Sequence, residues 1–232
     1  MSAPEEIVPG VYGVSLGFVN AFVLVDDEVT LIDTGLPRSH EKVSNAISSI
    51  GRPVGAVALT HYHFDHRGGL SKLAQTNTTV FAHPLDAGVV RGDAPEPGPN
   101  VGLPLKAVIA IVRPLLVGPP PPPFRVDREI VDGDEIPGTG GLRAIHTPGH
   151  TPGHLSFLHP AKRLLFVGDA AANRSRLSAP PRPGTRDMDE AKRAIGKIAS
   201  LDFDTAVFGH GTVLRGAANA EFRKLADTFA PA

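Results

Sequence analysis

The stretch that decides the fold is Thr60-His61-Tyr62-His63-Phe64-Asp65-His66-Arg67-Gly68-Gly69. It contains three of the ten histidines of the chain and follows directly on the apolar run 54–59. Imidazoles and a carboxylate this close together are costly to bury unless something satisfies them, and a divalent metal ion would do so. The stretch therefore predicts a metal site.

The composition is that of a globular chain whose metal ligands must be histidine and carboxylate. The 232 residues are 41% hydrophobic and 20% charged, and the formal net charge is -1, which gives no reason to expect binding to nucleic acid. The chain contains no cysteine, so thiolate ligands and disulfides are excluded. The first six residues have no basic start and no apolar stretch long enough for a signal peptide, and segment 101–117 is too short and too interrupted to span a membrane. We therefore expect a cytoplasmic protein that contacts no membrane.

Short strands, joined by turns and interspersed with helices, are predicted along most of the chain. The alternation of strands and helices indicates two similar α/β halves, with two sheets covered on the outside by helices. Ser39 is expected to cap the first helix. The predicted strands are 10–14, 20–25, 29–32, 54–59, 79–82, 142–145, 155–158, 164–167 and 206–208. The predicted helices are 39–50, 69–74, a short one after Pro84, 188–199 and 217–229.

Residues 91–129 differ in composition from the rest of the predicted single domain 1–232. This segment is rich in proline, with five consecutive prolines at 119–123, and it contains an apolar island at 103–117. We expect an insertion that crosses the surface as an arm or lid, stiffened by polyproline geometry. A plain linker, a pocket wall and a dimer contact are the alternatives, and the island makes a homodimer credible because it is too apolar to be left in water.

Four predicted strands end immediately before a histidine or an aspartate. Segment 54–59 leads into 61–66, and the other three lead into His150, Asp169 and His210. If these strands end on one rim, their side chains converge in a single cleft. His61 and His63 are two residues apart in an extended segment and can face the same ion.

These motifs resemble those of the metallo-β-lactamase-fold hydrolase superfamily, in its glyoxalase II and lactonase-like branch. The matching elements, in chain order, are Leu31-Ile32-Asp33-Thr34-Gly35, the His-x-His-x-Asp-His pattern at 61–66, Thr147 to His154, Gly168-Asp169 and Gly209-His210-Gly211. Five ordered motifs over residues 7–215 make coincidence improbable. Only the insertion lies outside the resemblance.

The resemblance implies a four-layer αβ/βα sandwich with two divalent metal ions between its halves. It implies zinc most often, with iron or manganese in similar sites, and imidazole-rich ligation suits zinc. Asp33 is expected to orient a ligand histidine, or to form the turn before Gly35, and His154 to brace the loop from outside. The implied ligands are His61, His63 and His150 for the first ion, Asp65, His66 and His210 for the second, and Asp169 between the two.

The predicted reaction is hydrolysis by a hydroxide that bridges the two ions, because metal ions lower the pKa of bound water to about 7. Asp65 can then deliver a proton to the leaving group. The predicted substrate is a small ester, thioester or lactone. Lactonases of this branch place a tyrosine where this chain has Ala172, which argues against lactone cleavage.

Three alternatives remain open from the sequence: a mono-iron persulfide dioxygenase, a phosphodiesterase of the same fold, and a metal-stabilised binding protein without catalysis. Candidates for contact with the substrate are Arg174 and Arg176, which could meet an anionic group, and His83.

Overall fold

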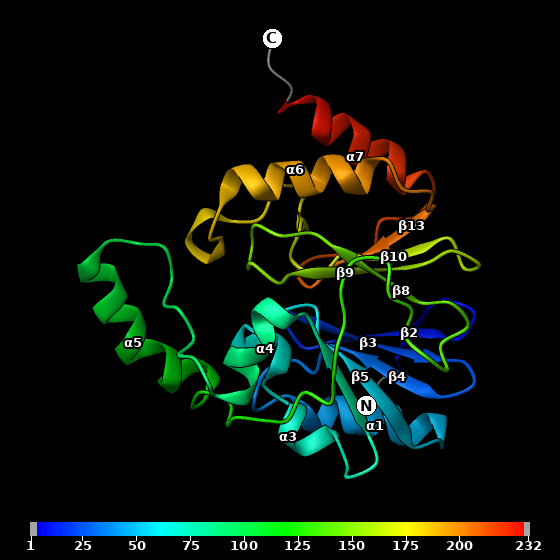
Figure 1. The fold of residues 1–232 in the computed structure, drawn as a ribbon, viewed down its shortest axis with the longest axis horizontal. Coiled ribbons are helices and arrows are strands. Elements are labelled where there is room, and N and C mark those ends of the chain that lie inside the picture. The colour runs from blue at the N-terminus through cyan, green and yellow to red at the C-terminus, as the bar shows by residue number, and fades with distance from the viewer. Residues whose placement is uncertain (1–3, 230–232) are drawn as a thin grey trace.

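The computed structural model describes residues 4–229 and has four layers (Figure 1). The first sheet has seven strands in sequential order from β1 to β7; β1 to β4 pair antiparallel, and β4 to β7 pair parallel. A second sheet has the order β13-β10-β9-β8. Helices cover the outer face of each sheet, as Figure 1 shows for α1 and α3 below and for α6 and α7 above. The predicted αβ/βα sandwich is confirmed.

The bounds of the first half follow the predicted strands closely. Its elements are β1 (Glu5–Val8), β2 (Val11–Ser15), β3 (Asn20–Val25), β4 (Val29–Ile32), α1 (His40–Ile50), β5 (Val54–Ala58), α2 (Phe64–Arg67), α3 (Leu70–Leu73), β6 (Thr79–Ala82), α4 (Pro84–Arg91), α5 (Leu103–Val117) and β7 (Arg128–Glu129).

The second half repeats the pattern of strands followed by helices. Its elements are β8 (Arg143–His146), β9 (Leu155–His159), β10 (Leu164–Phe166), β11 (Ala172–Asn173), β12 (Leu177–Ser178), the 3-10 helix η1 (Arg182–Gly184), α6 (Met188–Ala199), β13 (Thr205–Val207) and α7 (Ala218–Asp227). Strands β11 and β12 form a separate small hairpin.

Three apolar clusters separate the four layers. β5 shows how one strand serves two of them: Val57 packs toward the helices α1 and α3, while Ala56 and Ala58 face the second sheet. Alternation along a strand directs neighbouring side chains to opposite faces, so a strand buried on both faces must be apolar throughout. A third cluster lies between the second sheet and the helices α6 and α7, around Ile195 and Phe222.

One local prediction was wrong. Ser39 makes no capping hydrogen bond to α1; its hydroxyl donates to the carbonyl oxygen of Leu36 at 3.0 Å. The helix predicted at 69–74 is present as α3, whereas α2, just before it, was not predicted. The apolar island of the insertion forms the helix α5, which the sequence did not predict, and the role of the insertion as an arm or lid stays a prediction.

Helix α5 extends away from the four layers, as Figure 1 shows on the left. Leu103, Ile111 and Leu115 are 81%, 69% and 73% exposed, so these side chains find no cover within the described chain. The Pro-rich segment that follows α5 rejoins the four layers where the amide of Phe124 donates to the carbonyl of Val90 at 2.9 Å. The homodimer stays a prediction. No described helix is both long enough and apolar enough to cross a bilayer.

Candidate metal centre

The structure brings all seven predicted ligands into one cleft between the two sheets. Each comes from a loop that follows a strand: β5 leads into 61–66, β8 into His150, β10 into Asp169 and β13 into His210. The first sheet therefore supplies four of the seven side chains, and the second sheet supplies three. The convergence that the sequence predicted is present.

The first group of donors consists of His61, His63 and His150. The Nδ1 atom of His63 lies 2.9 Å from the Nε2 atom of His61 and 2.9 Å from the Nε2 atom of His150. Burial lowers the pKa of His63 to about 4 and that of His150 to about 3, so these rings are neutral near pH 7. A neutral imidazole can present a lone pair to a metal ion.

The second group consists of Asp65, His66 and His210. The Nε2 atom of His210 lies 3.4 Å from Oδ2 of Asp65, and the Nε2 atom of His66 lies 4.0 Å from that same oxygen. Burial disfavours the charged form of both histidines, but Asp169 and the neighbouring carboxylates outweigh it. They raise the pKa of His210 to about 10 and that of His66 well above its ordinary value. This side of the cleft therefore attracts positive charge.

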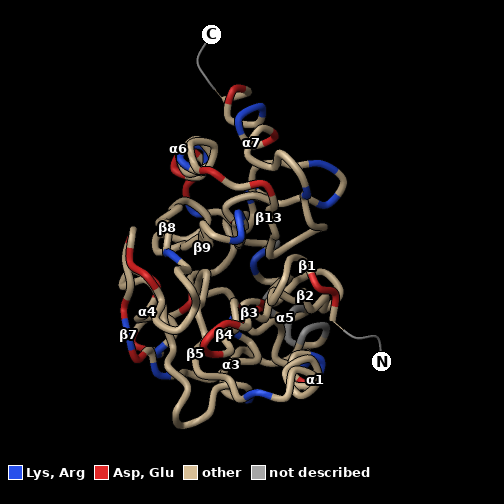
Figure 2. The backbone as a smooth tube through the Cα atoms, turned by 90° about the vertical axis from the view of Figure 1, so that its right-hand side faces the viewer, with Lys and Arg blue, Asp and Glu red and all other residues tan. Residues whose placement is uncertain are grey.

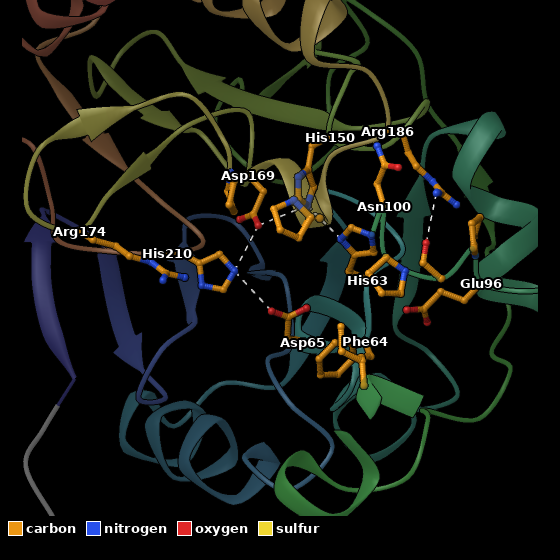
Figure 3. A pocket seen from close by; sticks show the side chains of 17 residues that line it. His63, Phe64, Asp65, Glu96, Asn100, His150, Asp169, Arg174, Arg186 and His210 are labelled. Atoms are coloured by element: carbon orange, nitrogen blue, oxygen red, sulfur yellow. Dashed lines mark hydrogen bonds and ion pairs between the residues drawn. The ribbon is translucent and has the colours of Figure 1, made fainter. Parts of the chain in front are cut away.

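Asp169 lies between the two groups (Figure 3). Its Oδ2 is 3.4 Å from Nε2 of His150 in the first group and 3.2 Å from Nε2 of His210 in the second. Its Oδ1 is 3.5 Å from Nε2 of His66. One carboxylate thus contacts members of both groups.

Asp33 fixes the orientation of two of the histidines. Its Oδ2 accepts from Nδ1 of His66 at 2.7 Å and from the hydroxyl of Thr60 at 2.7 Å, and its Oδ1 accepts from the amide of Thr60 at 2.8 Å. Because the Thr60 hydroxyl donates to Asp33, it must accept from Nδ1 of His61, 3.0 Å away. Nδ1 of His61 and Nδ1 of His66 therefore each carry a proton, which leaves Nε2 of each ring facing the cleft, where a metal ion would take the place of any further proton. Asp33 itself has a φ of 60°, a left-handed conformation that few residues other than glycine adopt.

The other two Nε2 donors are oriented in the same way. Nδ1 of His150 donates to the hydroxyl of Thr185 at 3.3 Å, because that hydroxyl already donates to the carbonyl of Pro181. Nδ1 of His210 donates to the carbonyl of Phe18 at 2.5 Å. In both cases the hydrogen bond leaves Nε2 directed at the carboxylates.

The donors fit a metal site because the cleft is incompletely satisfied without a cation. Nε2 of His66 and Oδ1 of Asp169 are buried and have no hydrogen-bond partner among residues 4–229. In the first group, Nε2 of His61 and Nε2 of His150 both face Nδ1 of His63, which can donate its single proton to only one of them, whereas a cation would satisfy all three nitrogens. Five imidazoles and two carboxylates form a donor set that suits zinc, iron or manganese.

His154 supports Asp169 from behind. Its Nε2 accepts from the amide of Asp169 at 2.8 Å, while its Nδ1 donates to the hydroxyl of Thr147, 2.9 Å away. The side chain does not itself reach the donor groups. Burial lowers its pKa well below the ordinary value, which keeps Nε2 able to accept.

One of the three predicted substrate contacts lines the cavity that opens onto the donor groups. This cavity of about 210 Å³ is lined by Arg174, whereas Arg176 and His83 are not among its lining residues. His83 instead caps α4, since its Nδ1 accepts from the amide of Leu85, and it stacks on His146. Phe64 forms part of the cavity wall. Tyr62 is buried in the cluster that lies between the first sheet and the helices α1 and α3.

Asp86, which no sequence motif indicated, connects the two loops of the first donor group. It is buried on α4 and accepts from the amide of Tyr62 at 3.2 Å, from the hydroxyl of Thr151 at 2.7 Å and from the amide of Gly153 at 2.7 Å. Tyr62 lies between His61 and His63, and Thr151 follows His150 directly. Nothing in the spacing of a single aspartate on a helix distinguishes this role.

A four-layer α/β sandwich with histidines and aspartates converging between its halves defines a class of metallo-hydrolase. The chain belongs to the metallo-beta-lactamase superfamily, whose family model matches residues 14–210. The resemblance drawn from the motifs is thereby confirmed.

Known proteins of this class cover most of the chain. The probable metallo-hydrolase YflN of Bacillus subtilis (strain 168) is 28% identical over 238 residues, which cover 91% of this chain and 87% of YflN. A hydroxyacylglutathione hydrolase of Alkalilimnicola ehrlichii is 33% identical over 177 residues, 75% of this chain and 54% of that protein. The crystal structure of TTHA1623 in a di-iron-bound form is 26% identical, has a TM-score of 0.68, and covers 97% of this chain and 98% of its own.

Proposed function

We propose that the protein hydrolyses a small ester, thioester or lactone with two divalent metal ions in the cleft. The position of Asp169 carries the proposal. A carboxylate within 3.5 Å of both donor groups is suited to bridge two ions, and each group offers three further donors within 4.8 Å of one another.

His61, His63 and His150 would hold the first ion, Asp65, His66 and His210 the second, and Asp169 would contact both. Bound ions of this kind polarise the bond to be cleaved and lower the pKa of coordinated water to about 7. Zinc is the metal that we propose, because imidazoles dominate the donor set. The di-iron form of TTHA1623 supports iron as the alternative.

Asp65 is placed to handle the proton of the reaction. It lines the cavity, and although burial raises its pKa, His66 and His210 lower it overall, so the carboxylate is ionised near pH 7. Its Oδ2, beside Nε2 of His210, can take a proton and pass it to a leaving group. Asp33 and His154 keep the surrounding donors in place.

The cavity supports a small organic substrate. Its walls include Phe64, Ile109 and four prolines, which exclude water and fit aliphatic groups. Figure 2 shows basic and acidic residues interspersed along the chain, with both signs on α6, and this does not resemble a nucleic-acid surface. The name of the Alkalilimnicola relative, a hydrolase of an acylated glutathione, supports acyl transfer to water.

Elemental analysis of the purified protein, followed by assays on esters, thioesters, lactones and phosphodiesters, tests the proposal. We expect about two metal ions per chain and turnover of at least one acyl substrate. His61→Ala should lose metal and activity, whereas His40→Ala, at the half-buried start of α1 and outside both donor groups, should retain both. Full metal and full activity in His61→Ala would contradict the proposal. Iron with thiol-dependent oxygen uptake would establish the dioxygenase instead, and phosphodiester cleavage alone would establish the phosphodiesterase.

A further inference from the structure

The cavity wall contains three charged side chains besides the proposed ligands: Glu96, Arg174 and Arg186. Two of them are engaged by the protein. Glu96 lies 3.5 Å from the guanidinium of Arg67, and Arg186 donates to the carbonyl of Gly98 at 3.2 Å. Arg174 has no hydrogen-bond or ion-pair partner within residues 4–229, and Figure 3 shows its guanidinium beside the His210 ring.

The backbone that carries Arg174 is held against the loop of His210. The amide of Asn173 donates to the carbonyl of His210 at 3.2 Å, and the amide of Thr212 donates to the carbonyl of Asn173 at 2.8 Å. Gly211 permits this approach: it has a φ of 114°, and a Cβ atom there would lie 2.1 Å from the Asn173 carbonyl oxygen. The backbone of Arg174 is therefore held beside the donor groups, and its exposed side chain lines the cavity.

We propose that Arg174 binds a carboxylate of the substrate, so that the substrate class is an ester, thioester or lactone that carries a carboxylate. The inference rests on the proposed function and names the substrate of that same site. A guanidinium pairs with a carboxylate through two parallel N–H···O bonds, which fixes both position and orientation. The remaining wall, with Phe64 and Ile109, accommodates the aliphatic part of such a molecule.

Two matched pairs of esters test the proposal on the metal-loaded protein. Mono-4-nitrophenyl glutarate and 4-nitrophenyl valerate differ by a carboxylate on the acyl side. The pair 4-acetoxybenzoate and 4-methylphenyl acetate places the carboxylate on the leaving-group side. The comparison between wild type and variant is made within each pair, so differences in intrinsic reactivity and in folded fraction cancel.

We expect Arg174→Ala to reduce the preference for the carboxylate member of at least one pair by roughly 10- to 100-fold, mainly through KM. Arg174→Lys should restore part of it as a point charge. Arg193→Ala, which removes a 70% exposed arginine side chain on α6, is the control and should leave the preference unchanged. The proposal is overturned if Arg174→Ala changes both members of each pair by the same factor, or if Arg176→Ala abolishes the preference instead.

A direct binding measurement separates this inference from the proposed function. If the wild type hydrolyses neither member of either pair, the proposed function fails for these esters, and calorimetric titration with glutarate decides the role of Arg174. Binding that weakens at least tenfold in Arg174→Ala and not in Arg193→Ala supports the carboxylate site. Equal binding in all three proteins, or no binding, overturns it.

Discussion

Replacing Asp86 by asparagine tests how the two loops of the first donor group are held together. The carboxylate accepts three hydrogen bonds, with Gly153 on one oxygen and with Thr151 and Tyr62 on the other. An asparagine of the same shape keeps one oxygen and places an amide NH₂ against a donor. At least one buried N–H group then loses its acceptor, and the loops lose part of their common anchor.

The expected loss in the free energy of unfolding is about 1–3 kcal/mol for Asp86→Asn, the cost of one buried donor without a partner. Asp86→Ala leaves the amides of both Tyr62 and Gly153 without an acceptor and should cost about twice as much. Chemical denaturation monitored by circular dichroism measures both. Metal content should fall in the same order, because His63 and His150 are no longer held at their present separation.

The pH dependence of the stability tests the buried role of Asp86 in a second way. Burial raises the pKa of Asp86 to about 6, partly opposed by its three hydrogen bonds, so the folded chain binds this proton more tightly than the unfolded chain. The stabilisation from that proton is complete below about pH 4 and is lost as the pH rises through 6. As the pH rises from below 4 to above 6, the free energy of unfolding of the wild type should fall by up to about 3 kcal/mol relative to that of Asp86→Asn, which has no such proton.

Asp93→Asn, at an exposed position just after the same helix, is the control and should change stability by less than about 0.5 kcal/mol. The reasoning is refuted if Asp86→Asn and Asp86→Ala match the wild type in stability and in metal content. A loss of stability that leaves the metal content unchanged would show that Asp86 supports the fold without positioning the ligands.

Three further predictions concern the metal centre. Gly209→Ala should reduce metal affinity at least tenfold, because its Cβ would lie 2.2 Å from Oδ1 of Asp169. Gly196→Ala on α6, where nothing lies within 4 Å, is the control: it should leave metal affinity unchanged and should be neutral or stabilise the fold by up to about 1 kcal/mol. Competition with a chromogenic chelator measures the metal affinity of both variants. Asp33→Asn should weaken metal binding roughly 10- to 100-fold in the same assay while the far-ultraviolet spectrum is unchanged, since one amide oxygen cannot replace both the oxygen that accepts from His66 and the Thr60 hydroxyl and the oxygen that accepts from the Thr60 amide. Chelation should lower the thermal midpoint of the wild type, and added metal should restore it; an unchanged midpoint would mean that no ion contributes to the folded state.

The donor residues could be predicted because they combine two signals. Each follows an apolar strand, and the histidines and the aspartate at 61–66 are too crowded for any ordinary packing role. Because these strands were expected to end on one rim, His150, Asp169 and His210 could be predicted to lie beside them. The fold class followed from the alternation of strands and helices along the chain, because each sheet needs helices to cover its outer face.

The parts that escaped prediction depend on partners that lie far away in the sequence. Asp86 is in the first turn of α4, where an acidic residue is favoured by the helix dipole alone, so its position gives no sign of a buried role. The two-residue strands β7, β11 and β12 exist only through their pairing. The helix α5 was obscured by the prolines around it, although Pro104 lies in its first turn, where proline is tolerated.

The division of the donors between the two sheets has a consequence for folding. Each donor group draws side chains from both halves of the chain, so neither half can assemble a complete set alone. An ion bound there would act as a noncovalent cross-link in a chain that has no cysteine for a covalent one. The docking of the halves sets the effective concentration of one set of ligands around the other, so loosening that docking should weaken metal binding even when every ligand is unchanged.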